Sequence, residues 1–166
     1  MKDASSEDPA LGADAYHALD YNQQLVQFAD SKAGTLIVIN SLFIAAAGAV
    51  GAQSDLGRLL QAGFVIGSAV AVLYCLSVVM TRGTTPIEGK PDLIFFADIL
   101  KRQRASAYSY EFRTTSRSAH MDAILRRTFV VAEIAQRKFA SYTTAQTLTA
   151  GSAALWLASN VLNLLR

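Results

Sequence analysis

Charged residues are scarce in this 166-residue chain, at 17% of the sequence, whereas soluble domains average about 25%. Apolar residues make up 52% of the chain, and the mean hydropathy is +0.27. This composition excludes an intrinsically disordered protein and argues against an ordinary soluble enzyme. The length suits one domain of common size, so we expect a single domain over residues 1–166.

Residue types that commonly carry chemistry are also few. The chain has one cysteine, Cys75, and two histidines, His17 and His120. A lone cysteine forms no disulfide within the chain, and the histidines lack the spacing of a metal-binding motif. The glycine motifs GxGxxG, GxxxxGKS/T and GxSxG are missing as well. We therefore predict no metal, no cofactor and no catalytic centre, and interpret both histidines as solvated helix residues.

Three long runs carry no charge at all. They cover residues 33–54, 59–81 and 139–165 and contain 22, 23 and 27 residues. A helix of 22 residues is about 33 Å long, which matches a hydrocarbon core of about 30 Å. Because so short a chain cannot surround three such helices with polar layers, the runs predict an all-α membrane protein. We expect a bundle of three transmembrane helices with helical cytoplasmic extensions.

The third run is more polar than the other two. Ten of its 27 residues are polar, namely Ser141, Thr143, Thr144, Gln146, Thr147, Thr149, Ser152, Ser159, Asn160 and Asn163. One side of this helix is therefore expected to face protein or water.

Positive charge is unevenly divided between the two sides that three spans create. Residues 1–32 contain two Lys or Arg and residues 82–138 contain eleven, while the short link 53–58 and the C-terminus contain one each. Basic residues concentrate on the cytoplasmic side of membrane proteins. We therefore expect 1–32 and 82–138 to be cytoplasmic. The same bias accounts for the basic excess, so no nucleic-acid partner is expected.

The cytoplasmic segments also carry helical patterns. Apolar residues recur on one face from Asp14 into the first span, which predicts one continuous helix. The glycines and prolines of 82–91 predict a loop, and 92–100 predicts a short helix at the membrane. A second stripe leads into the third span and is expected to pack on residues 14–32; its members are Met121, Leu125, Thr128, Ala132, Ala135 and Phe139.

Short connections and small residues indicate how the spans pack. The link 53–58 is short enough to force an antiparallel hairpin, and we assign turn roles to Asp55 and Gly57. Gly63 and Gly67 have GxxxG spacing in the second span, and Gly48 lies on a similar face of the first. Such residues let helix backbones approach closely, within a chain or between chains.

Charges gather where the chain enters the membrane. They comprise Asp30 and Lys32 before the first span, Arg82 after the second, and Arg137 with Lys138 before the third. One interpretation is ordinary anchoring at the lipid headgroups. The other is that these residues converge with Asp98 into a site for an anionic ligand, where Lys and Arg would complement a phosphate.

Three segments resemble a known family. They are NQQLVQFADSKAG at 22–34, which runs into the first span through Asn40, DLIFFADI at 92–99, and AEIAQRKF at 132–139. With the order of the spans, they resemble the transmembrane effector of bacterial Pycsar antiphage systems over nearly the whole chain. FADSKAG is the most specific part of this resemblance.

The resemblance implies a non-enzymatic protein of the bacterial inner membrane. Such an effector responds to cyclic CMP or cyclic UMP from a partner cyclase, impairs the membrane and causes abortive infection. We expect a homo-oligomer, because three helices cannot enclose a wide lumen. Two alternatives stay open: a membrane-anchored scaffold for a cytoplasmic partner, and a membrane enzyme that uses Asp98 or Glu133.

Overall fold

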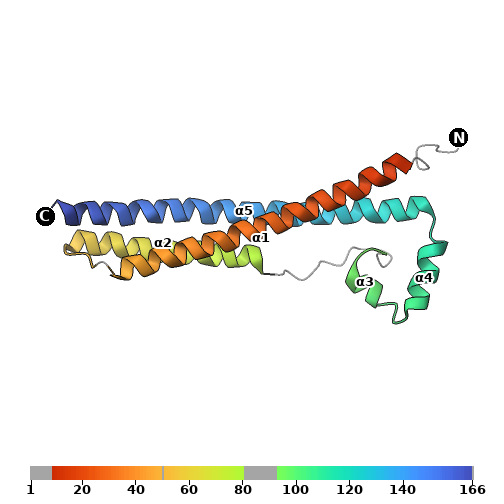
Figure 1. Ribbon diagram of the computed structural model, residues 1–166, viewed down its shortest axis with the longest axis horizontal. Helices are drawn as coiled ribbons and strands as arrows, with labels where there is room; N and C mark the ends of the chain where they lie inside the picture. The colour runs from red at the N-terminus through yellow and green to blue at the C-terminus, as the bar shows by residue number, and fades with distance from the viewer. Residues whose placement is uncertain (1–8, 50, 81–92, 166) are drawn as a thin grey trace. The chain divides into compact units, whose positions relative to one another are not determined.

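The computed structural model describes residues 9–49, 51–80 and 93–165 (Figure 1). Within these ranges the regular elements are all helices: α1 (Pro9–Ala49), α2 (Asp55–Val79), α3 (Phe96–Leu100), α4 (Ala105–Thr114) and α5 (Arg117–Leu164). The expected all-α class is confirmed. Residues 1–8, Arg82 and the predicted loop 82–91 lie outside the described residues.

The chain folds into two compact units. The first comprises Met1–Leu25 and Arg82–Ile134, and the second comprises Val26–Thr81 and Ala135–Arg166. Helices α1 and α5 contribute to both, because each is a single uninterrupted helix of 41 and 48 residues. The prediction that the helix from Asp14 continues into the first charge-free run is therefore confirmed, and α5 likewise joins 119–138 to the third run.

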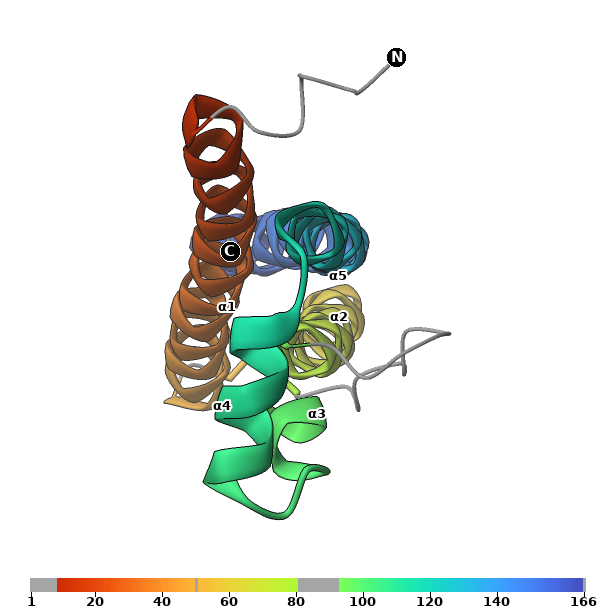
Figure 2. The same cartoon turned by 90° about the vertical axis from the view of Figure 1, so that its right-hand side faces the viewer.

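In the second unit, the later parts of α1 and α5 lie beside α2 (Figure 2). Among the described helices, the Ala10–Ala49 stretch of α1 and the whole of α2 are long and apolar enough to cross a membrane. The polar side chains of α5 lower its hydropathy below theirs. Two apolar helices thus indicate a membrane protein, and the third span stays a prediction.

The connection between α1 and α2 differs from the predicted one. Helix α2 begins at Asp55, with Ser54 as its N-cap. The Ser54 Oγ accepts a hydrogen bond of 3.0 Å from the Gly57 N–H, which satisfies a donor that the first helical turn leaves free. Asp55 and Gly57 are therefore in the first turn of α2, and their predicted turn roles are wrong.

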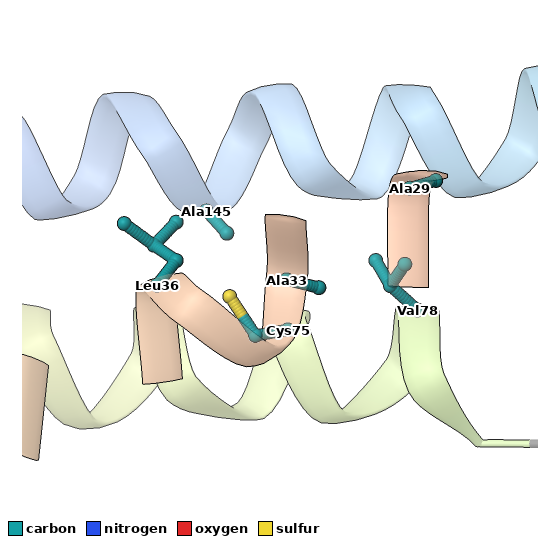
Figure 3. Close-up of a cluster of buried hydrophobic side chains, with 6 residues drawn as sticks. All are labelled: Ala29, Ala33, Leu36, Cys75, Val78 and Ala145. Atoms are coloured by element: carbon teal, nitrogen blue, oxygen red, sulfur yellow. The ribbon is translucent and has the colours of Figure 1, made fainter. Parts of the chain in front are cut away.

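The core of the second unit is built from small side chains of all three helices (Figure 3). Cys75 and Val78 of α2 are fully buried against the small or medium-sized side chains Ala29, Ala33, Leu36 and Ala145 of α1 and α5. Small residues bring helix axes close together and increase dispersion contact between backbones, which is how helices associate in lipid. Cys75 therefore acts as a packing residue.

The first unit is held together by polar and aromatic contacts. The Arg102 guanidinium donates to both carboxylate oxygens of Glu111, at 2.5 and 3.1 Å, and this hydrogen bonding raises the pKa of Arg102 above its ordinary value. The Tyr108 hydroxyl donates to the Leu93 carbonyl at 3.1 Å. These bonds attach α4 to the segment around α3 within the first unit.

The buried face of α5 differs from the predicted apolar stripe. Leu125 is 50% exposed, whereas Ile124 is 1% exposed, and Arg127 and Val131 are also buried. Over its first turns the buried stripe therefore lies one position earlier than predicted. The reason is Arg127, whose guanidinium lies 3.7 Å from the centroid of the Phe95 ring and is packed as an apolar residue would be.

The two histidines have different surroundings. His17 is exposed, whereas His120 shares a 2.6 Å hydrogen bond with the Tyr16 hydroxyl and packs edge-on against Phe112. Interpreting His120 as a solvated residue was therefore wrong. Its contacts join the first part of α1 to α5, which is the pairing expected for the segments around 14–32 and 119–138.

Candidate functional site

Lys138 is the centre of the charged cluster in the second unit. Its Nζ donates to Asp30 Oδ1 of α1 at 2.5 Å and to the Val78 carbonyl oxygen of α2 at 2.5 Å. The Lys138 side chain is 15% exposed and that of Asp30 is 34% exposed. One ammonium group on α5 therefore binds both other helices of the unit, in surroundings that shield it from much of the solvent.

The contact with Val78 caps the end of α2. Helix α2 ends at Val79, so the Val78 carbonyl is one of the last four, which have no partner within the helix. A positive charge there also complements the negative end of the helix dipole. Lys138 therefore stabilises the end of α2, and Asp30 balances its charge.

Lys32 is placed by aromatic rings. Its Nζ lies 4.6 Å from the centroid of the Phe28 ring and 6.0 Å from that of Tyr142. Cations bind favourably over aromatic faces, and Phe28 stands one helical turn before Lys32. Lys32 itself is exposed. An exposed ammonium next to two ring faces can bind a ligand that has both a negative charge and an aromatic base.

The other two predicted residues have different environments. Arg137 is exposed on α5. Asp98 belongs to the first unit, where its carboxylate accepts a 2.6 Å hydrogen bond from Lys101. The structure thus joins Asp30 to Lys138 directly, places Lys32 beside Tyr142 of α5, and pairs Asp98 with a neighbour in its own segment.

The three predicted packing glycines also differ from one another. A Cβ added to Gly67 would collide with the Ser152 hydroxyl oxygen, and one added to Gly63 would lie 3.3 Å from Leu155 Cδ1. Both glycines therefore lie where α2 meets α5. At Gly48, no described heavy atom lies within 4 Å of the Cβ position, so the described part of the chain makes no close contact there.

Sequence reasoning missed several partners of these residues. The Val78 carbonyl is main chain and carries no side-chain signature. The aromatic partners of Lys32 could have been found in part, since Phe28 and Lys32 are four residues apart on one helix. Tyr142 could not, because its approach depends on how α5 packs on α1.

Comparison with known proteins supports the resemblance seen in the sequence. The family model described as the Pycsar effector protein domain, PycTM, matches residues 14–164. The chain belongs to this family. The PycTM match spans nearly all of both units, including the cluster around Lys138. No curated protein and no solved structure matches the chain.

Proposed function

We propose that this chain is an antiphage defence effector of the bacterial inner membrane that senses a cyclic pyrimidine nucleotide and impairs the membrane. The observation that carries the proposal is the PycTM match over residues 14–164 in a chain with two membrane-length apolar helices. In this proposal α5 supplies a third span, and the N-terminus and residues 82–138 are cytoplasmic. The protein acts without catalysis.

The cluster around Lys138 supports a way of sensing an anionic ligand. In the structure Lys138 binds Asp30 and the Val78 carbonyl. A nucleotide phosphate could replace Asp30 as the negative partner of Lys138, and Lys32 with its two aromatic neighbours could bind the base. Loss of the Asp30 contact would loosen α1 from α2 and α5. The ligand must bind the loosened arrangement more tightly than the resting one to drive the change.

Membrane potential tests this proposal directly. Cells that express the protein at low level are followed with a voltage-sensitive dye, before and after expression of a partner cyclase or addition of cyclic CMP or cyclic UMP. We expect depolarisation only when the nucleotide is present. An unchanged potential, with the protein inserted and the nucleotide measured in the cells, contradicts the proposal.

The outer side of α5 supports assembly from several copies. Exposed small residues recur along it at spacings of four and three, namely Ala140, Thr144, Thr147, Gly151, Ala154 and Ala158. The exposed side of α2 is instead made of large apolar residues suited to lipid, among them Leu59, Ile66, Val70 and Leu73. A smooth face of small residues suits contact with another helix.

Cysteine cross-linking in membranes tests this assembly. The native Cys75 is fully buried, so cysteines introduced by Thr147→Cys or Ala154→Cys should dominate the reaction with an oxidant. We expect both variants to give mostly disulfide-linked dimers on a non-reducing gel. Leu73→Cys, at a position 63% exposed on α2, is the matched control. Cross-linking as strong at position 73 as at 147 would contradict assembly through α5.

A second candidate function is a membrane-anchored scaffold. The first unit exposes large aromatic side chains, including Phe96 at 66%, Tyr110 at 73% and Phe129 at 67%. Such residues are common at protein interfaces, so a cytoplasmic partner could bind there. This candidate predicts no change of membrane potential with or without nucleotide, which the dye experiment distinguishes.

A further inference from the structure

Asn40 is a polar residue buried in the middle of the second unit. It is 0% exposed, and its Nδ2 donates to the Leu36 carbonyl at 2.9 Å and to Thr149 Oγ1 at 2.8 Å. Thr149 Oγ1 donates its own hydrogen to the Ala145 carbonyl at 2.9 Å, so it accepts from Asn40. The other side-chain atom, Asn40 Oδ1, is buried without a hydrogen-bond partner among the described residues.

Ser68 of α2 is the second such residue. It is also 0% exposed, and nothing in the described part of the chain forms a hydrogen bond with its Oγ. Two unpartnered polar atoms in the core of one small helical unit are unusual, because buried polar groups in native proteins are nearly always paired.

A contact between α1 and α2 places Asn40 and Ser68 at one level. Gln61 Nε2 donates to the Ala47 carbonyl at 2.5 Å, which fixes one contact between α1 and α2. Asn40 precedes Ala47 by seven residues and Ser68 follows Gln61 by seven. Seven residues are close to two helical turns, and residue numbers fall along α2 as they rise along α1. Asn40 and Ser68 therefore return to the facing sides of the two helices at the same depth.

The neighbouring residues of α5 lie at this level as well. Thr149 bonds to Asn40, and Ser152, one turn later, abuts Gly67 beside Ser68. The contact between α2 and α5 here is made of a glycine and a serine, so separating the helices at this point loses little apolar packing. On either side the unit has more apolar contacts, including Leu36 with Cys75 and the ring of Phe64 next to Trp156.

We propose that Asn40, Ser68 and Thr149 form a polar layer that binds water inside the second unit, and that water first penetrates the helix bundle at this layer when the effector acts. Asn40 Oδ1 accepts a hydrogen from the water, and Ser68 Oγ can donate or accept, which gives a bound water the partners it needs. Hydrocarbon offers neither atom a partner. The second half of the proposal rests on the proposed membrane-impairing function.

A melting experiment on purified protein in lipid nanodiscs tests the layer without any signal. The double variant Asn40→Leu with Ser68→Ala removes both unpartnered atoms and leaves Thr149 bonded to its own helix. We expect it to melt about 2–4 °C above wild type, because apolar groups of similar size replace polar groups that only an ordered water can pair in this core, and ordering a water costs entropy. Melting below wild type would show that the layer and its water stabilise the resting bundle, and would overturn the proposal that the bundle opens there.

Matched controls lie close by on the same helices. Ser41 and Ser77 donate to carbonyls of their own helices, Ile37 at 2.8 Å and Tyr74 at 2.7 Å. The double variant Ser41→Leu with Ser77→Ala should therefore melt near wild type. A rise as large as that of the Asn40 and Ser68 variant would assign the effect to general hydrophobicity and overturn the proposal.

Thiol labelling tests the penetration of water. The full chain with Ser68→Cys is placed in vesicles and treated with a small charged methanethiosulfonate, with and without cyclic CMP or cyclic UMP; wild type gives the background from Cys75. We expect labelling of position 68 to become at least tenfold faster with nucleotide. Ile66→Cys, at a position 65% exposed on α2, should stay unlabelled in both conditions because it faces lipid.

The outcomes separate this inference from the proposed function. Nucleotide-dependent depolarisation without labelling at position 68 would overturn the layer as the place of penetration and leave the proposed function standing. If wild type never depolarises, the proposed function and the penetration step both fail, and the melting comparison still decides whether the layer weakens the resting bundle.

Discussion

Replacing Lys138 with methionine is expected to lower the free energy of unfolding by about 1–3 kcal/mol, because it leaves a half-buried carboxylate and a helix-end carbonyl without their donor. The affected groups are Asp30 and the Val78 carbonyl, which both bind the Lys138 ammonium at 2.5 Å. Methionine keeps the length of the apolar stem, so packing changes little. Thermal melting in nanodiscs measures the loss as a fall of about 2–4 °C for each kcal/mol.

The neighbouring residue supplies the control. Arg137→Met removes an exposed charge from the same helix turn. It should change the free energy of unfolding by less than about 0.5 kcal/mol. Adding Asp30→Asn to Lys138→Met should recover part of the loss, because the uncompensated carboxylate is then gone. In cells, Lys138→Met removes the group that would bind the nucleotide phosphate, so the membrane potential is expected to stop responding to nucleotide. A Lys138→Met protein that melts and responds as wild type would remove this cluster as the sensing site.

The long helices could be predicted because their signals are local. Absence of charge over 22 residues or more reflects the thickness of a membrane, and a continuous apolar face predicts an uninterrupted helix whatever it packs against. The predicted α1–α2 connection, residues 53–58, lies later in the chain than the observed one between Ala49 and Asp55. The cause of this error is also local. Ser54 bonds to the Gly57 N–H, and such a cap can be recognised in a sequence only when the start of the helix is already known.

The errors in the site arise from partners that are distant in the sequence. Arg127 is buried because Phe95, far from it in the chain, places a ring against its guanidinium. Asn40 stood inside the segment that carried the family resemblance, yet its bond to Thr149 joins residues 109 positions apart. A helical stripe assigned from hydropathy alone counts Arg127 as polar and exposed, and so the predicted face of α5 was misplaced by one residue over its first turns.

Replacing Gly67 with leucine is expected to destabilise the second unit by about 1–3 kcal/mol or more through overpacking. Even a single Cβ at this position would collide with the Ser152 hydroxyl, and the Ser152 Cβ would lie 3.4 Å away. A leucine side chain must therefore push α2 away from α5. Because the buried Ser68 is the next residue, the same displacement would open the polar layer, and we expect a low melting temperature together with faster thiol labelling of Ser68→Cys without nucleotide.

Two comparisons isolate the steric cause. Gly151→Leu makes the same change on α5, where no described heavy atom lies within 4 Å of the Cβ position, and it should stabilise the isolated protomer by up to about 1 kcal/mol through helix propensity. Gly67→Ala should be less harmful than Gly67→Leu, and adding Ser152→Ala should restore its melting temperature, because the colliding hydroxyl is then gone. If Gly67→Leu and Gly151→Leu melt alike, α2 and α5 do not meet at Gly67. Opposite shifts would establish the close contact on which both the resting bundle and its opening depend.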